Sequence, residues 1–449
     1  KINSFNAKWT FVLLRATHEQ KELMNKRLLS IILVVFIDLL GFSLILPLLP
    51  YYAEKYGATQ FVTGLLVASY AVMQLIGAPL LGRLSDRYGR RPILLASVFG
   101  TFLGFLLLGF ADNIGTALAN AFDPQAANIF VLGILFLSRM VDGLTGGNLS
   151  VAQAYISDVT DEQNRSKGLG MIGAAFGMGF IIGPATGGIL SQWGYAVPGF
   201  VAAALSFINL SLIYFWLPES LTEEKRADMP EKKPAITLSA LTQALTRPFT
   251  GAILTTRFFY GLAFAIFQTL FALYALQKFN FQARDTGFIL TYVGVLSVFV
   301  QGFLIGRLTK RYREDVLILI GCVMMTVSLI GWALTPSVFW LLVVLAPTAI
   351  SGGILNTLLS STLTKAVQPQ EIGGILGLGS AIESATRIFA PIIGGYLLQT
   401  FGTWSPGVFG GVMMLGITIF IYFTIYNHPI ANEIRAKSIQ QAAPVPNGD

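Results

Sequence analysis

The chain has 449 residues, of which 54% are hydrophobic and only 12% are charged, and its formal net charge is +7. Water-soluble domains carry about a quarter charged residues, so this composition excludes a string of soluble domains. The apolar residues come in runs of about twenty, the length that crosses a hydrocarbon core about 30 Å thick. We therefore expect the chain to be an integral membrane protein.

Twelve membrane-spanning helices are predicted in chain order. They cover residues 28–50, 61–82, 92–111, 129–155, 168–190, 195–217, 250–276, 285–308, 315–335, 338–363, 374–398 and 404–427. The runs lack the alternating pattern of a membrane barrel, and a backbone in lipid must satisfy its own hydrogen bonds. The first run is too long for the core of a cleavable signal, so we expect it to be the first span. The fold class is therefore an all-α membrane protein.

The connection 218–249 divides the predicted spans into two groups of six. It combines four prolines with many charged residues, a composition typical of a solvated linker. We expect a terminal segment (1–27), a six-helix half (28–217), the linker (218–249), a second six-helix half (250–427) and a tail (428–449). Near the end of the linker, leucines at partly helical spacing predict a short interfacial helix before the seventh span.

Lysine and arginine are concentrated in the connections that follow even-numbered spans. The alternate connections contain only Lys55, Lys278 and Arg284. By the positive-inside rule, this asymmetry predicts that both termini are cytoplasmic in a multi-pass protein of the inner (plasma) membrane. Because the basic residues are divided among loops, we expect contact with anionic lipid headgroups and none with nucleic acid.

The two halves contain matching sequence marks. Residues 82–88 after the second span recur as 306–312 after the eighth, and Gly183-Pro184 in the fifth span recurs as Ala390-Pro391 in the eleventh. Such repeats predict two pseudo-symmetric halves with a binding site near the midplane between them.

Residues 82–91 resemble the signature loop of the major facilitator superfamily, and the fifth span resembles the antiporter motif of proton-coupled drug exporters. The first span, with Asp38, and residues 154–160 are most similar to tetracycline/proton antiporters. The resemblance implies the major facilitator fold of two six-helix halves and transport by alternating access. It also implies a gate loop of Gly82, Asp86, Arg87, Gly89, Arg90 and Arg91, and an antiporter motif of Gly179, Gly183, Pro184, Gly187 and Gly188. These residues could instead have structural roles only: the glycines could allow close helix packing, and the basic loop could anchor the chain on the cytoplasmic side.

Five charged residues are predicted near the middle of the bilayer, where each costs about 2.5–3.5 kcal/mol. They are Asp38, Arg139, Asp142, Glu383 and Arg387. Helical spacing allows Arg139 to pair with Asp142, and Glu383 with Arg387, and both could be static ion pairs. Counting three carboxylates against two arginines leaves one carboxylate to bind a proton reversibly. We assign that role to Asp38, with Arg139 approaching it from the fourth span.

Polar and aromatic residues within the spans are candidates for substrate contacts. They are Gln153, Phe264, Gln268 and Asn356. The seventh span is also rich in phenylalanine, and this combination of polar and aromatic residues favours an amphiphilic compound as the substrate. Neither histidine nor the single cysteine suggests a metal site, and we expect no cofactor beyond transported protons. No nucleophile–base set or phosphate loop indicates an enzyme.

The predicted function is secondary active transport, with proton-coupled export of a small amphiphilic, drug-like or tetracycline-like compound by a monomer. The first alternative is a proton-independent facilitator or importer of a small polar solute. The second is a membrane scaffold or sensor that transports nothing.

Overall fold

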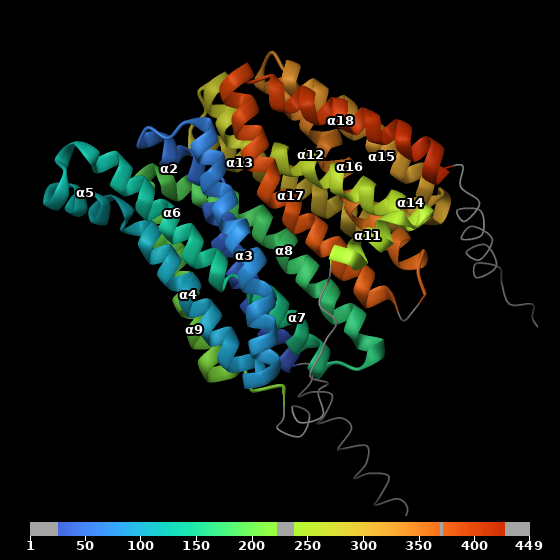
Figure 1. Ribbon diagram of the computed structural model, residues 1–449, viewed down its shortest axis with the longest axis horizontal. Coiled ribbons are helices and arrows are strands. Elements are labelled where there is room, and N and C mark those ends of the chain that lie inside the picture. The colour runs from blue at the N-terminus through green and yellow to red at the C-terminus, as the bar shows by residue number, and fades with distance from the viewer. Residues whose placement is uncertain (1–25, 222–237, 369–370, 427–449) are drawn as a thin grey trace, which may run out of the picture. The chain divides into compact units, whose positions relative to one another are not determined.

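The computed structural model describes residues 26–221, 238–368 and 371–426, and within these the secondary structure is helical (Figure 1). Long helices lie at all twelve predicted spans in the described chain. The first six are residues 26–45 with α2 (Leu49–Lys55), α3 (Gln60–Tyr88), α4 (Arg90–Gly109), α6 (Ala127–Thr145) with α7 (Asn148–Val159), α8 (Glu162–Leu190) and α9 (Ala196–Trp216). The second six are α12 (Pro248–Phe279), α13 (Ala283–Phe299) with α14 (Ile305–Arg311), α15 (Glu314–Leu334), α16 (Val338–Lys365), α17 (Ile372–Phe401) and α18 (Ser405–Ile421). By length and apolar composition, 11 of these helices qualify as membrane spans, and α17 is the remaining long helix.

Two shorter helices lie in the connections. The short helix expected before the seventh span is present as α11 (Leu238–Thr246). The connection 112–128 forms α5 (Ala111–Phe122), which lies beside α6 in Figure 1. A Cβ on Gly115 of α5 would lie 2.7 Å from the backbone N of Val131, so the glycine permits this close approach.

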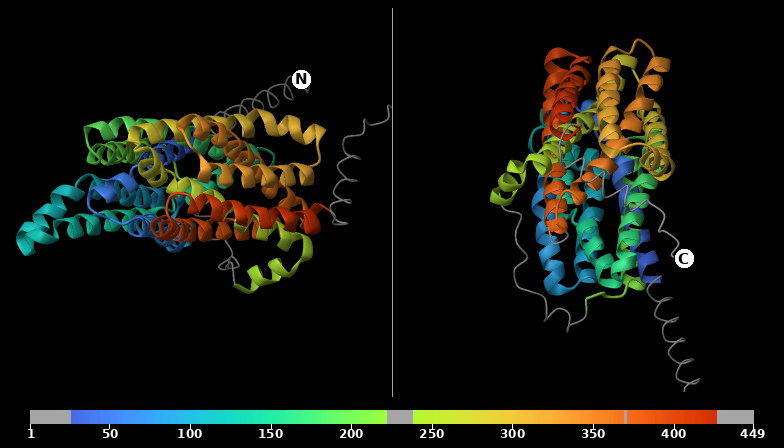
Figure 2. Two further views of the ribbon diagram at one scale, coloured as in Figure 1. Left: turned by 90° about the horizontal axis from the view of Figure 1, so that it is seen from above. Right: turned by 90° about the vertical axis from the view of Figure 1, so that its right-hand side faces the viewer.

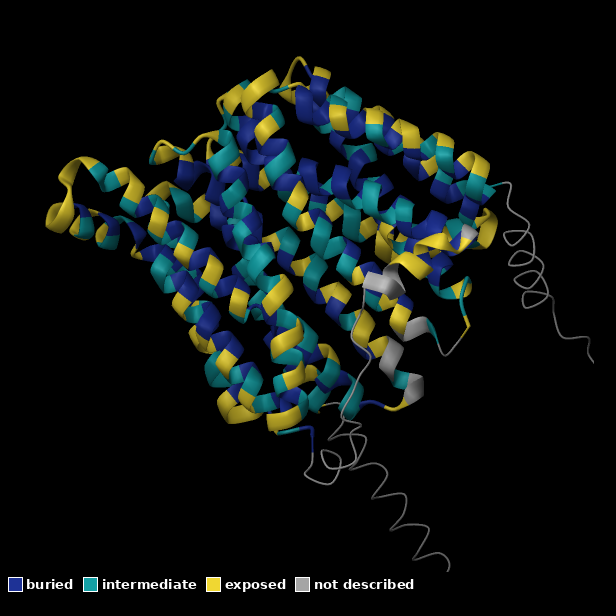
Figure 3. Ribbon diagram, viewed as in Figure 1, coloured by how far each residue is buried: buried dark blue, intermediate teal, exposed yellow. Residues whose placement is uncertain are grey.

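Exposed and buried residues alternate along the spans (Figure 3), and many of the exposed ones have large apolar side chains. In α9, Phe207 and Phe215 are 59% and 75% exposed, as expected for a surface that contacts lipid tails. Where α9 meets α4, a Cβ on Gly199 would lie 2.9 Å from the backbone N of Gly109. Small residues at this contact allow the two backbones to approach closely, which is the usual basis of helix association in membranes.

The helices form two compact units. Unit 1 contains residues 26–45, 72–183 and 193–221. Unit 2 contains residues 46–71 and 184–192 together with the described residues from 238 onward. Unit 2 therefore includes two short segments of the first predicted half that pack with helices of the second half.

The core of unit 2 lies mainly among α12, α15, α16 and α18, and it contains an aromatic cluster where α12 meets α15. The packing of α15 between α16 and α18 can be followed in Figure 2. Trp332 of α15 is 1% exposed and contacts Phe267 and Tyr274 of α12 at ring-centroid distances of 5.3 and 4.8 Å. The Tyr274 hydroxyl donates to the Trp332 carbonyl at 2.8 Å. This contact buries the polar tip of Tyr274 with a partner, as an apolar environment requires.

Two contacts in unit 2 join matching positions of the repeated motif. A Cβ on Gly287 of α13 would lie 2.2 Å from the carbonyl O of Pro184 in α8, and one on Gly64 of α3 would lie 2.2 Å from that of Pro391 in α17. Both positions therefore require glycine, and the two prolines of the repeat make equivalent contacts. Nearby, the hydroxyls of Tyr51 and Thr286 are 2.5 Å apart and buried.

Candidate functional site

The fourth span is interrupted near its middle. Helix α6 ends at Thr145 and α7 begins at Asn148, with Gly146 and Gly147 between them. The Gln74 side-chain amide donates to the Gly146 carbonyl at 2.9 Å, and the Ser97 hydroxyl donates to the Thr145 carbonyl. Side chains thus satisfy carbonyls freed by the break, a feature of discontinuous helices that line binding sites. The span predicted over 129–155 is confirmed, and Gly146-Gly147 marks the break within it.

Asp38, in the first span, contacts the first residue of α7. Its Oδ1 accepts a hydrogen bond of 2.5 Å from the Asn148 side-chain amide, and Asn148 Oδ1 accepts one of 3.1 Å from Ser97 Oγ. Asn148 is the first residue of α7, and a helix N-terminus carries partial positive charge. Asp38 is therefore hydrogen-bonded by an amide at a helix terminus, and the approach of Arg139 to it stays a prediction.

The predicted pair of Arg139 and Asp142 is confirmed. Arg139 Nη1 lies 3.1 Å from Asp142 Oδ2, and the two side chains are 2% and 4% exposed. The guanidinium also lies 5.3 Å from the ring centroid of Phe105. Removing either member would leave a buried charge unpaired, which typically costs about 3–5 kcal/mol.

The predicted pair of Glu383 and Arg387 is wrong. Glu383 Oε1 instead lies 2.5 Å from Nη2 of Arg257 on α12, while Arg257 Nη1 donates to Ser360 Oγ at 2.8 Å. Arg387 is exposed and has no hydrogen bond or ion pair with the described residues. Helical spacing permitted the intrahelical pair, but a neighbouring helix supplies the partner. The charge count also changes, because Arg257 brings the interior arginines to three against three carboxylates.

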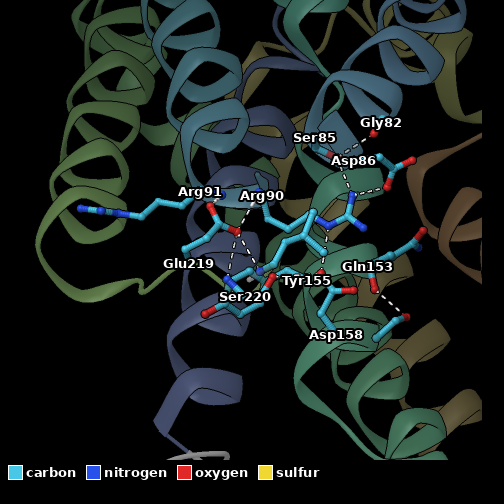
Figure 4. Close-up of polar contacts among 12 residues, drawn as sticks. Gly82, Ser85, Asp86, Arg90, Arg91, Gln153, Tyr155, Asp158, Glu219 and Ser220 are labelled. Carbon is cyan, nitrogen blue, oxygen red and sulfur yellow. Dashed lines mark hydrogen bonds and ion pairs between the residues drawn. The ribbon is translucent and has the colours of Figure 1, made fainter. Parts of the chain in front are cut away.

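The gate loop is organised around Arg90, which is 2% exposed (Figure 4). Its Nη1 lies 2.6 Å from Asp86 Oδ1 and 2.8 Å from Ser85 Oγ, and its Nε lies 2.9 Å from Asp158 Oδ2. A guanidinium with two carboxylates is a strong, geometrically specific arrangement. These contacts all lie in unit 1, so a latch between the two halves stays a prediction.

The start of the linker also contacts this cluster. Figure 4 shows Glu219 beside Arg90 and Arg91, whose backbone N–H groups donate to its carboxylate at 2.9 and 3.0 Å. The Ser220 hydroxyl donates to Asp158 Oδ2 at 2.9 Å. A carboxylate on the first N–H groups of α4 satisfies donors that have no partner within the helix. Asp158 lay in the stretch that suggested a family resemblance, but no pattern in the sequence assigned these contacts.

The other gate residues have separate positions. Gly89 joins α3 to α4 with φ 104°, a conformation that favours glycine. Arg91 Nη2 donates to the Tyr214 carbonyl at 2.5 Å, and the Arg87 guanidinium lies 5.4 Å from the ring centroid of Tyr88. No atom lies within 4 Å of a Cβ placed on Gly82.

The antiporter motif is divided between the two units. In unit 1, Ser43 Oγ donates to the Gly179 carbonyl at 2.8 Å, and a Cβ on Gly183 would lie 2.1 Å from that hydroxyl. In unit 2, a Cβ on Gly188 would lie 2.9 Å from Cα of Arg284, while Gly187 is buried. The motif glycines thus permit close approach along α8.

The candidate substrate residues are not all in one unit. Gln153 is exposed in unit 1. In unit 2, the ring of Phe264 lies 6.0 Å from that of Tyr260, Gln268 is partly buried, and Asn356 is exposed. Among the residues that the structure describes, no three histidine, cysteine or acidic side chains are grouped to hold a metal ion.

An exposed ion pair joins the segments before α12 and α17. Arg247 donates to both oxygens of Glu371 at 2.8 and 3.2 Å. The side-chain hydrogen bond from Arg247 lowers the pKa of Glu371 below its usual value. The pair is solvent-exposed, so its contribution to stability is small.

Twelve long helices in the described part of the chain, with ion pairs among them and an interrupted fourth span, are typical of a polytopic membrane transporter. The model of the Major Facilitator Superfamily matches residues 31–384 and 253–446, and the chain belongs to this family. It is accordingly a transporter and not an enzyme.

Relatives extend along most of the chain. The class H tetracycline resistance protein of Pasteurella multocida is 30% identical over 416 residues, which are 89% of this chain and 96% of that protein. The class C protein of Escherichia coli is 32% identical over 379 residues, covering 82% and 89%. The crystal structure of the human organic anion transporter MFSD10 has a TM-score of 0.62 at 20% identity, over 89% of this chain and 99% of that chain.

Proposed function

We propose that the protein couples an inward flow of protons to the export of a small amphiphilic compound, drug-like or tetracycline-like, across the inner membrane. The observation that carries this proposal is Asp38, a carboxylate within a span whose side-chain partner is an amide at the interruption of another span. Tetracycline resistance proteins among the relatives support the substrate class. We further propose that the protein works as a monomer with no bound cofactor.

The physical basis of coupling is a carboxylate whose proton affinity depends on the conformation around it. When Asn148 donates to Asp38, the hydrogen bond and the N-terminus of α7 favour the charged carboxylate. A rearrangement at Gly146-Gly147 that withdraws α7 would leave the carboxylate without this support and favour proton binding. The proton can then be bound in one state and released in the other.

The second element of the proposed mechanism is the pair of close contacts made by Pro184 and Pro391. Each proline carbonyl contacts a glycine of a helix from the other half, Gly287 or Gly64. When two backbones are this close, even a small separation disrupts their packing. We therefore propose that the two contacts form and break together during alternating access.

Purified full-length protein in liposomes with an imposed pH gradient tests the function. Tetracycline and other amphiphiles should accumulate against their gradient when protons flow the opposite way, and a protonophore should abolish the accumulation. Accumulation that is indifferent to the pH gradient would instead favour the proton-independent facilitator.

The proposed orientation has its own test. In a Cys322→Ala background, a single cysteine at Glu223 should react with an impermeant thiol reagent only from the cytoplasmic side, because the basic connections face the cytoplasm. A cysteine at Asn120, in α5, should react only from outside. Glu223 lies outside the described residues. The reverse labelling pattern would overturn the orientation of both termini.

A further inference from the structure

Arg387 lies on a polar face of α17. It is 15 residues after Ile372 in a helix of 30 residues, and it shares a helix face with Ser380 and Ser384. Ser380 and Arg387 are exposed, whereas Leu378 and Ile382, on the opposite face, are 6% and 7% exposed. An arginine facing lipid at this depth is costly, so this face is expected to line a hydrated path through the protein.

The carboxylate nearest in sequence to Arg387 is held by another helix. The Arg257–Glu383 ion pair, at 2.5 Å, directs Glu383 towards α12, where Ser360 of α16 also contacts Arg257. Two arginines and one carboxylate therefore leave a surplus positive charge in this part of unit 2. Since no described residue accepts a hydrogen bond from Arg387, its guanidinium keeps all five N–H donors for a ligand.

Aromatic residues lie near Arg257 on α12, which packs against α17. On α12, Arg257, Gly261 and Phe264 share one helix face. A Cβ on Gly261 would lie 3.3 Å from the hydroxyl of Thr386, the residue before Arg387. The Phe264 ring stacks with Tyr260 at 6.0 Å. A cation and an aromatic pair on adjacent helices suit a ligand with an aromatic body and an anionic end.

We infer that Arg387 binds an anionic group of the transported compound, such as a carboxylate, and that Arg257 is a positioning residue that prevents Glu383 from neutralising Arg387. A guanidinium matches a carboxylate with two parallel hydrogen bonds, which an ammonium group cannot reproduce. The inference rests on one part of the proposed function, that the protein transports a small amphiphilic compound. It does not depend on proton coupling.

Matched acid and amide ligands test the inference. Purified full-length protein in phosphatidylcholine nanodiscs would be titrated with 2-naphthoate, 2-naphthamide and the corresponding anthracene pair, and protein-free nanodiscs would correct for partitioning into lipid. The acid should bind about 10- to 100-fold more tightly than its amide, as expected for a charge-assisted hydrogen-bonded pair. Arg387→Gln should remove this difference, Arg387→Lys should keep part of it, and Arg307→Gln, which removes an exposed arginine at the end of the eighth span, should not change it.

The positioning role has a separate readout. Arg257→Gln should weaken acid binding because Glu383 becomes free to approach Arg387, and adding Glu383→Gln should restore it. A purely structural role for Arg257 predicts no rescue by the second substitution.

Several outcomes would overturn the inference. Equal binding of acid and amide to the wild type would do so, even if pH-driven transport of another compound upheld the proposed function. A second such outcome combines two results: no preference for acid over amide, and an anionic lipid that native mass spectrometry finds on the wild type but not on Arg387→Gln. This outcome would assign Arg387 to a lipid phosphate instead. Acid selectivity without any response to a pH gradient would uphold the inference and refute only the coupling.

Discussion

Asp38→Asn is expected to abolish accumulation driven by a pH gradient while leaving exchange of substrate across the membrane partly intact. Asparagine retains the size of aspartate and can still bond to the Asn148 amide, but it cannot take up a proton. One pH unit corresponds to about 1.4 kcal/mol, so a one-for-one exchanger sustains a substrate gradient of about tenfold. The Asp38→Asn variant should sustain no substrate gradient. Gradient-driven uptake and substrate exchange, measured in the same liposomes, would show this difference.

Two variants make this experiment decisive. Asp123→Asn removes an exposed carboxylate at a turn beyond the spans and should accumulate substrate like the wild type. Glu383→Gln tests the rival carboxylate of α17, which is paired with Arg257. If Asp38→Asn still built a gradient and Glu383→Gln did not, the proton site would lie in α17.

Arg90→Gln is expected to cause the largest loss of stability among single changes in the gate loop. Arg90 is 2% exposed and contacts Asp86 and Asp158, so its removal leaves two partly buried carboxylates without their cation. Breaking a pair of this kind typically costs about 3–5 kcal/mol, and partial exposure of both carboxylates places the expected loss near the lower end of that range. Thermal loss of monodisperse protein in detergent would measure it.

The gate loop offers matched comparisons. Arg83→Gln removes an exposed arginine of the same loop and should change the stability by no more than about 0.5 kcal/mol. Asp86→Asn keeps a hydrogen-bond acceptor for Arg90, so expression should be unchanged while the transport rate falls. A normal rate in Asp86→Asn would leave the loop only as a basic anchor on the cytoplasmic side.

The membrane architecture could be predicted from the sequence because the bilayer imposes a local rule. Any segment within lipid must satisfy its backbone hydrogen bonds internally, so each apolar run of sufficient length becomes a helix wherever it lies in the chain. The twelve spans, the short helix α11 and the pair of Arg139 with Asp142 all depend on spacing within one segment. Such features are determined by the sequence itself.

The site could be predicted only in part, because its partners come from different helices. Asp38 was identifiable as a charge within a span, but its contact with Asn148 depends on how α7 meets the first span. Glu383 was paired with the wrong arginine because Arg257 lies 126 residues away and only packing brings it near. The Glu219 carboxylate at the start of α4 is likewise a tertiary contact. Spacing along one helix reveals which charges share a face, whereas the choice among possible partners depends on interhelical distances that only the folded chain determines.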